Sequence, residues 1–111
     1  MKKKIYISGP MRGKKESESR HAFAEAQAML EAEGYIAIDP WDLQEYIPGL
    51  TDYESLHLDI EILILCDAIY MLPGWTRSLG ARQEFRAAVR HEKEIRYHDD
   101  AEHAEHTDYD I

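Results

Sequence analysis

The sequence has little cysteine, no long apolar run and a shortage of positive charge. Its single cysteine, Cys66, excludes an internal disulfide and favours a reducing compartment, so we expect a cytoplasmic location and a buried, unreactive thiol. No run approaches the roughly 18 apolar residues of a membrane span, and no signal-peptide core follows the lysines at the start. A net charge of −9 argues against binding to a nucleic-acid polymer. We therefore expect neither a membrane nor a polymer as partner.

The length and the charge distribution predict one folded domain with an acidic tail. A chain of 111 residues forms a single domain with a core of ordinary size. Residues 98–111 contain six acidic residues and neither Lys nor Arg, and they lose the alternation of apolar and polar residues. We expect an α/β domain over residues 1–97 and a flexible tail over residues 98–111. Histidines scattered in such a tail are more often solvated than metal-bound, so we expect no metal site there.

Strand and helix patterns alternate along the predicted domain. Short apolar runs bounded by Gly and Pro predict strands, and apolar residues at helical spacing predict helices. A strand, a helix and a strand within about 35 residues form a βαβ unit, so the sheet should be parallel. The fold class is a single Rossmann-like (flavodoxin-like) α/β domain, with a parallel sheet of four to five strands flanked by helices. Strands are expected at 4–8, 35–38, 67–72 and 94–97, helices at 17–33, with Ser17 as N-cap, at 53–65 and at 79–92, and irregular structure at 41–52.

Residues 66–84 combine a buried strand, a polar loop and the start of a helix. A helix start presents unpaired N–H groups and the positive end of the helix dipole, so this arrangement can hold an anion. Ser78 suits the N-cap, and Gly80 allows a ligand to approach the backbone closely. Glu84 lies six residues after Ser78, near the mouth of the same cleft. A carboxylate beside an anion site indicates that Glu84 acts on the substrate.

The loops after the predicted strands carry most of the other candidate residues. Ligands of open parallel sheets bind at the carboxyl ends of the strands. The basic loop after the first strand is either a phosphate contact or a solvated turn, and Trp75 either stacks on a base or packs in the fold. Asp59 on the preceding helix is either an ordinary solvated carboxylate or a partly buried one with a raised pKa. The candidates in the loops are Ser8, Gly9, Met11, Arg12, Gly13, Asp39, Trp75, Ser78 and Gly80.

Three motifs carry a resemblance to a known superfamily over about residues 4–97. They resemble those of the nucleoside 2-deoxyribosyltransferases and, within that superfamily, the 2′-deoxynucleoside 5′-phosphate N-hydrolases. The Leu-Pro-Gly-Trp run at 72–75 is similar to a group of short proteins of uncharacterised function, the domain-of-unknown-function 4406 family. The motifs are Ile-Tyr-Ile-Ser-Gly-Pro-Met-Arg-Gly at 5–13, Asp59, and Ser-Leu-Gly-Ala-Arg-Gln-Glu at 78–84.

The resemblance implies a catalytic role for three of these residues. Glu84 matches the nucleophile that attacks the anomeric carbon and forms a covalent deoxyribosyl intermediate. Asp59 matches the acid that protonates the leaving base, and Tyr6 matches a tyrosine that orients the nucleophile. A carboxylate is suited to this reaction, because it stabilises and traps the oxocarbenium-like state through which a glycosidic bond breaks.

The resemblance also implies the ligand and the functional alternatives. Arg12 and Ser78 match contacts to a 5′-phosphate, and Gly9 and Gly80 match residues that shape the loops. The implied activity is N-glycosidase action on a (2′-deoxy)nucleoside 5′-monophosphate, in a homodimer that needs no cofactor. Three alternatives stay open: deoxyribosyl transfer between bases, nucleotide binding without turnover, and an interaction protein that works through residues 98–111.

Overall fold

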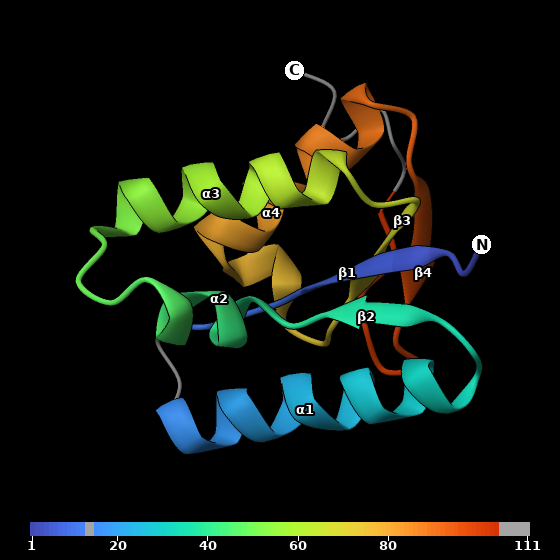
Figure 1. Cartoon of the computed structure of the whole chain (residues 1–111), viewed down its shortest axis with the longest axis horizontal. Coiled ribbons are helices and arrows are strands. Elements are labelled where there is room, and N and C mark those ends of the chain that lie inside the picture. The colour runs from blue at the N-terminus through green and yellow to red at the C-terminus, as the bar shows by residue number, and fades with distance from the viewer. Residues whose placement is uncertain (13–14, 105–111) are drawn as a thin grey trace.

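A computed structural model describes residues 1–12 and 15–104 of the chain. They form a four-stranded sheet with helices on both faces (Figure 1). No helix in the described part of the chain is long and apolar enough to cross a membrane. The elements in chain order are β1 (Lys4–Ser8), α1 (Glu16–Ala32), β2 (Ile36–Ile38), α2 (Pro40–Tyr46), α3 (Asp52–Ile64), β3 (Ala68–Met71), the 3₁₀ turn η1 (Trp75–Arg77), α4 (Leu79–Arg90) and β4 (Glu94–Tyr97).

The sheet has the strand order β2-β1-β3-β4, and all neighbouring strands are parallel. This confirms the predicted Rossmann-like α/β fold, with four strands. The chain first moves from β1 to β2 on one side and then crosses to β3 on the other side. The strand order therefore reverses between β1 and β3, where Ser8 pairs with Met71 at the carboxyl ends. Parallel α/β folds open a ligand crevice at such a point.

Successive residues of β1 face opposite sides of the sheet. Ile5 and Ile7 pack in the core beneath α1, whereas Tyr6 packs in the core formed with α3 and α4. Figure 1 shows α1 on one side of the sheet and α3 and α4 on the other. Side chains two residues apart on a strand share a face. The second residue after Tyr6, Ser8, therefore points to the side of α4.

The first helix begins at Glu16, one residue earlier than predicted, and no side chain caps it. Lys15 is the N-cap, and its carbonyl oxygen accepts hydrogen bonds from the N–H groups of Glu18 and Ser19, at 3.1 Å each. The prediction that Ser17 caps this helix was wrong. The predicted end is confirmed, since Gly34 follows the last residues of the helix with φ of 97°, a conformation that glycine adopts without strain.

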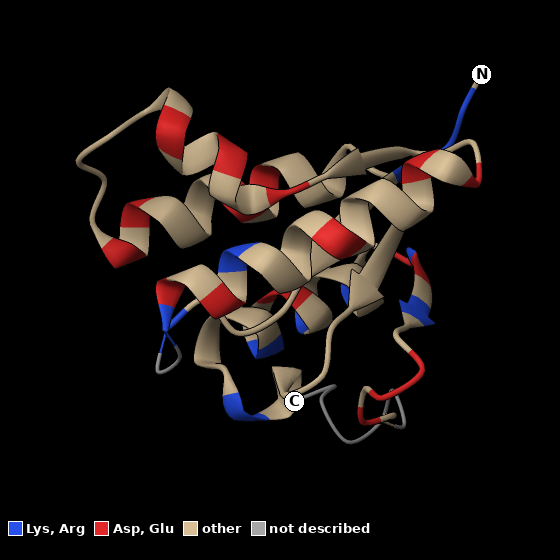
Figure 2. Cartoon of the chain, turned by 90° about the horizontal axis from the view of Figure 1, so that it is seen from below, with Lys and Arg blue, Asp and Glu red and all other residues tan. Residues whose placement is uncertain are grey.

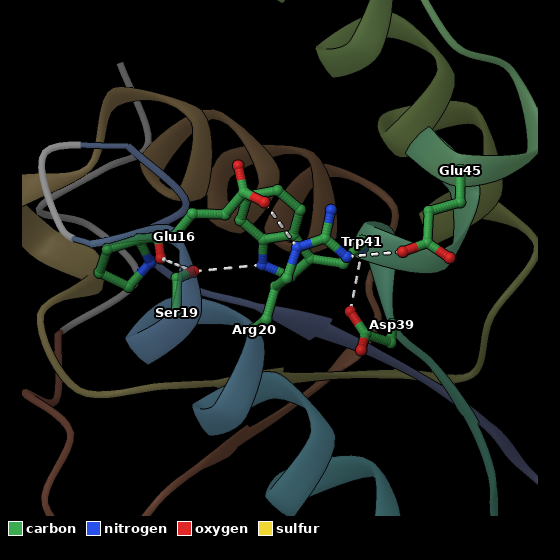
Figure 3. Close-up of polar contacts among 7 residues, drawn as sticks. Glu16, Ser19, Arg20, Asp39, Trp41 and Glu45 are labelled. Carbon is green, nitrogen blue, oxygen red and sulfur yellow. Dashed lines mark hydrogen bonds and ion pairs between the residues drawn. The ribbon is translucent and has the colours of Figure 1, made fainter.

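The segment predicted to be irregular contains a helix, α2. The Asp39 carboxylate accepts a hydrogen bond from the Trp41 N–H at 2.9 Å, and Pro40 occupies the first helical position. The Trp41 indole N–H donates to the Ser19 hydroxyl at 3.2 Å, and the Arg20 guanidinium lies 4.5 Å above the indole ring (Figure 3). The Asp39-Pro40 pair therefore both ends β2 and begins α2.

Residues 98–104, which the sequence analysis assigned to a flexible tail, pack against the domain. The Glu102 carboxylate accepts hydrogen bonds from the Gly74 N–H at 2.7 Å and from the Thr76 hydroxyl. The Trp75 indole N–H donates to the Glu102 carbonyl oxygen at 2.7 Å, and Ala101 is buried. The acidic composition predicted solvation, but this carboxylate meets backbone donors at the start of η1. The rest of the predicted tail, residues 105–111, lies outside the described residues.

Charged residues are distributed unevenly over the surface. Acidic positions occur along several helices, whereas basic positions form small, separate groups (Figure 2). Asp and Glu number 22 in the sequence, against 13 Lys and Arg. A site for a small anion therefore depends on local arginines and helix N–H groups rather than on the overall field of the protein.

Candidate active site

A cavity of about 570 Å³ opens at the carboxyl ends of β1 and β3. Helices α2 and α3, the loop after β1, and the η1–α4 segment supply its walls. A second cavity, of about 320 Å³, lies beside α1 on the other face of the sheet and contains none of the predicted site residues. The predicted residues that line the larger cavity are Gly9, Met11, Arg12, Asp59, Ser78, Gly80 and Glu84.

Glu84 projects from α4 toward β1, and its side chain is 5% exposed. The Tyr6 hydroxyl donates a hydrogen bond to Oε2 at 2.8 Å, and the Ser8 hydroxyl donates to Oε1 at 2.6 Å. Burial raises the pKa of Glu84 from its ordinary 4.5 to about 8, helped by the neighbouring Asp59, whereas the two hydroxyl hydrogen bonds lower it. Tyr6 thus makes the contact with Glu84 that the resemblance implies, and Ser8 makes a second one.

Asp59 enters the same cavity from α3. Of the two alternatives for Asp59, a solvated or a buried carboxyl group, the structure shows the buried one, since the residue is 5% exposed. Burial raises the pKa of Asp59 to about 7, and its interaction with the Tyr6 hydroxyl opposes that rise. Burial and the two carboxyl groups also raise the pKa of Tyr6 well above its ordinary value. The tyrosine therefore keeps its proton and acts as a donor.

The start of α4 forms the wall of the cavity next to two arginines. The Ser78 hydroxyl accepts a hydrogen bond from the Ala81 N–H at 3.2 Å, which confirms Ser78 as the N-cap. Arg12 lines the cavity but is exposed, and its Nη2 lies 2.7 Å from Oδ1 of Asp52. Arg77 precedes Ser78 and lines the cavity as well. An anionic ligand thus meets two cationic groups here, one of them already paired.

The two glycines of the site differ in what surrounds them. A Cβ atom on Gly9 would lie 2.7 Å from the Leu72 Cβ, so the closeness of the β1 and β3 ends requires glycine there. A Cβ atom on Gly80 would meet no described atom within 4 Å. The space at Gly80 is therefore open toward the cavity and available to a ligand.

Two predicted ligand contacts occupy structural positions instead. Asp39 caps α2, and burial raises the pKa of its carboxyl to about 6. Trp75 is completely buried, and its ring stacks on Phe85 with 4.6 Å between the centroids. Neither residue lines the cavity, so packing is the correct interpretation of Trp75. A further candidate, Gly13, lies outside the described residues.

Several residues that line the cavity were not predicted. Three of them lie on α3 and precede the predicted Asp59 at helical spacing, namely Asp52, Ser55 and Leu56. Positions three, four and seven residues before Asp59 lie on the same face of a helix, and this spacing would have predicted them from the sequence. The helical prediction began at 53 and so left Asp52 outside it. Gln44 was missed because the segment that carries it was predicted to be irregular.

Two features of the described residues outside the cavity concern metal binding and thiol chemistry. Within residues 1–12 and 15–104, no three His, Cys, Asp or Glu side chains are grouped so that they could hold a metal ion. Cys66 is buried, and burial raises the pKa of its thiol to about 11. The prediction that Cys66 is buried is confirmed, and its lack of reactivity stays a prediction, which the raised pKa favours.

The comparisons with known proteins define first the class of fold and then the family. The structure is similar to that of a 2-desoxiribosyltransferase from Leishmania mexicana, with a TM-score of 0.62 and 22% identity. The similarity covers 86% of this chain but 63% of the transferase chain, so it shows a shared nucleoside 2-deoxyribosyltransferase-like fold. The model of the family described as a domain of unknown function (DUF4406) matches residues 3–97, and the chain belongs to that family. No curated protein has significant sequence similarity to the chain.

Proposed function

We propose that the protein hydrolyses the base–sugar bond of a (2′-deoxy)nucleoside 5′-monophosphate. The observation that carries the proposal is the pairing of Glu84 and Asp59, two buried carboxyl groups from different helices that line one cavity. The Tyr6 hydroxyl interacts with both of them. Two carboxyl groups in different surroundings can divide the roles of nucleophile and acid, as glycoside hydrolysis requires.

The proposed reaction has two steps. An oxygen of the Glu84 carboxylate attacks the anomeric carbon, the carbon–nitrogen bond breaks, and the leaving base takes a proton from Asp59. The Asp59 carboxylate then accepts a proton from water, whose oxygen attacks the same carbon. The ester bond to Glu84 breaks, which releases the sugar phosphate and restores both carboxyl groups to their starting states.

The roles require charge on Glu84 and a proton on Asp59. Two hydroxyl donors contact Glu84, and hydrogen bonds to a carboxylate favour its charged form. The pKa values of both groups are raised, to about 8 for Glu84 and about 7 for Asp59, so the pair retains a proton near neutral pH. This order places the proton more often on Glu84, so the reactive arrangement, with the proton on Asp59, is the less populated one. The pair titrates as a coupled unit, so its two steps belong to both residues together.

The proposed specificity for a phosphate rests on the other end of the cavity. Arg12, Arg77 and the first turn of α4 with Ser78 line that end. A helix start and two guanidinium groups are suited to a phosphate monoester. We therefore expect nucleoside monophosphates to react faster than nucleosides.

Two other functions have an observation in their favour. One similar solved structure is that of a transferase, which favours deoxyribosyl transfer between bases. The raised pKa of Glu84 favours a neutral carboxyl group, which can donate a hydrogen bond to a sugar hydroxyl in a nucleotide-binding protein without turnover. The homodimer, the cytoplasmic location and an interaction role for residues 98–111 stay predictions.

Base release from nucleotides tests the proposal directly. Purified protein is incubated with each common ribo- and deoxyribonucleoside 5′-monophosphate, and free base is separated by chromatography. Glu84→Gln removes the nucleophile, and Glu61→Gln, an exposed change on α3, is the matched control. The proposal expects base from the wild type and from Glu61→Gln but not from Glu84→Gln. Base release by Glu84→Gln at the wild-type rate, or its absence throughout, would reject it.

A labelled-base exchange assay separates hydrolysis from transfer. The wild-type protein receives a nucleoside monophosphate together with a different, labelled free base. Hydrolysis produces sugar phosphate and leaves the label free. Label in new nucleotide without net sugar phosphate would establish transfer instead. A nucleotide that binds tightly and is recovered intact would establish the binding function.

A further inference from the structure

We propose that Ser8 is a positioning residue, which together with Tyr6 holds the Glu84 carboxyl group in one orientation. The catalytic meaning of this inference rests on the proposed function. The structural part does not, because it concerns only how β1 holds a carboxyl group of α4. Ser8 was predicted to contact the ligand, and the inference replaces that role.

Each oxygen of Glu84 has its own hydroxyl donor. Ser8 contacts Oε1 at 2.6 Å and Tyr6 contacts Oε2 at 2.8 Å. One hydrogen bond would let the carboxyl group rotate about its bond to the side chain, whereas two bonds to different oxygens hold its plane. A nucleophile that is held in place loses less freedom on reaching the transition state.

The position of Ser8 is itself determined by the sheet. Its carbonyl oxygen accepts a hydrogen bond from the Leu72 N–H at 2.8 Å, and its partner in β3 is Met71. Tyr6 and Ser8 share a face of β1 because they are two residues apart. The spacing of side chains along one strand therefore sets the spacing of the two donors.

Ser8 is placed to contact the carboxylate rather than a ligand. Its side chain is 1% exposed, and it does not line the cavity although its neighbour Gly9 does. A serine at this position puts a donor behind Glu84 without filling the cavity. A nucleotide atom would have to displace Glu84 to reach the Ser8 hydroxyl.

The groups that face Glu84 explain why a second donor matters. Tyr6 approaches from β1 and Asp59 from α3, while Arg12 and Arg77 lie at the cavity wall. Burial and Asp59 both disfavour a charge on Glu84, and the hydroxyl groups of Ser8 and Tyr6 oppose them. Removal of the Ser8 hydroxyl should therefore make the carboxyl group harder to ionise.

The decisive measurement is the titration of Glu84 itself, by NMR of protein labelled with carbon-13 at the glutamate carboxyl carbons. The signal that disappears in Glu84→Gln identifies the residue. In Ser8→Ala the titration midpoint should rise by about one to two pH units, as expected for loss of a hydrogen bond to a charged group. Ser8→Thr keeps the hydroxyl and should stay near the wild type, and Tyr6→Phe should shift the midpoint in the same direction as Ser8→Ala.

Ser19→Ala is the matched control for removal of a buried serine hydroxyl. Ser19 is also 1% exposed, and its hydroxyl donates to the Pro10 carbonyl oxygen at 2.8 Å and accepts from Trp41 (Figure 3). It lies on the α1 side of the sheet, so its loss should leave the Glu84 midpoint unchanged. An unchanged or lowered midpoint in folded Ser8→Ala, or an equal rise in Ser19→Ala, would overturn the inference.

The titration needs no nucleotide, so its outcome is independent of the proposed function. If the wild type releases no base but Ser8→Ala shifts the midpoint, the proposed function fails and the role of Ser8 stands. If base is released, Ser8→Ala should lower kcat more than it changes KM. A shift of one pH unit corresponds to about a tenfold loss of kcat well below the midpoint, with recovery at higher pH.

Discussion

Replacement of Glu84 with glutamine should stabilise the folded protein at neutral and alkaline pH. Burial raises the pKa of this carboxyl group from 4.5 to about 8. The unfolded chain therefore loses its proton at lower pH than the folded chain does, and the wild-type free energy of unfolding falls as pH rises between these two values. Glutamine does not titrate, so the variant lacks this decline.

The size of the effect follows from the pKa difference. Each unit of difference corresponds to about 1.4 kcal/mol, so the full difference sets an upper bound of about 5 kcal/mol above pH 8. Glutamine is also polar and buried, and it must share hydrogen bonds with Tyr6 and Ser8, which costs about 1 to 2 kcal/mol. The net gain at pH 8 should be about 2 to 4 kcal/mol, and toward pH 4.5 it should reverse to a net loss of about 1 kcal/mol, because the cost of burying glutamine remains when the titration effect is gone.

Urea unfolding at a series of pH values between 4.5 and 8.5 measures this difference. The exposed change Glu61→Gln is the control, since it alters one carboxyl group of α3 that is open to solvent. The decisive quantity is the change of the stability difference with pH rather than its value at one pH. A gap between Glu84→Gln and wild type that stays constant over this range would refute the reasoning.

Four other predictions follow from the same contacts. Base release should depend on pH as a bell between the raised pKa values of the carboxyl pair, about 7 and about 8, which a kcat profile checks. Asp52→Asn frees Arg12 from an exposed ion pair at 2.7 Å and should tighten nucleotide binding by about two- to fivefold without affecting the nucleoside, as calorimetry would show. Gly80→Ala should stabilise α4 by about 0.5 to 1 kcal/mol in denaturant but raise KM, because its methyl group enters the open space beside the cavity. Glu102→Gln should lower Tm by weakening the contacts to the loop before α4. Partial burial raises the pKa of Glu102, but hydrogen bonds from Thr76 and Gly74 lower it to about 2, so this stabilisation is present above the ordinary value of 4.5 and is lost as pH falls toward 2.

Local sequence patterns were sufficient for the elements that carry the site. The apolar runs of β1 and β3, and the Ser78 start of α4, are visible in composition and capping chemistry. The parallel sheet followed from the alternation of strands and helices, because parallel strands need a crossover connection. These features depend on neighbouring residues, and so they are readable without the fold.

Elements whose signal had a second meaning were misread. The Asp39-Pro40 pair ends β2 and begins α2, and the first function concealed the second. The aromatic ring of Trp75 is suited both to stacking on a base and to packing in the core. Which of the two it does depends on where α4 packs. Glu102 carries the charge of a solvated residue, yet its hydrogen-bond donors lie 26 to 28 positions earlier in the chain.

The tertiary structure alone decided the chemical state of the site. The sequence determined that Tyr6, Asp59 and Glu84 were candidates, partly through the resemblance. It could not determine that Ser8 and Tyr6 each contact one oxygen of a residue 76 and 78 positions away, nor that both carboxyl groups are buried. Burial and distance arise when separate elements pack together, and they set the pKa values on which the proposed reaction depends.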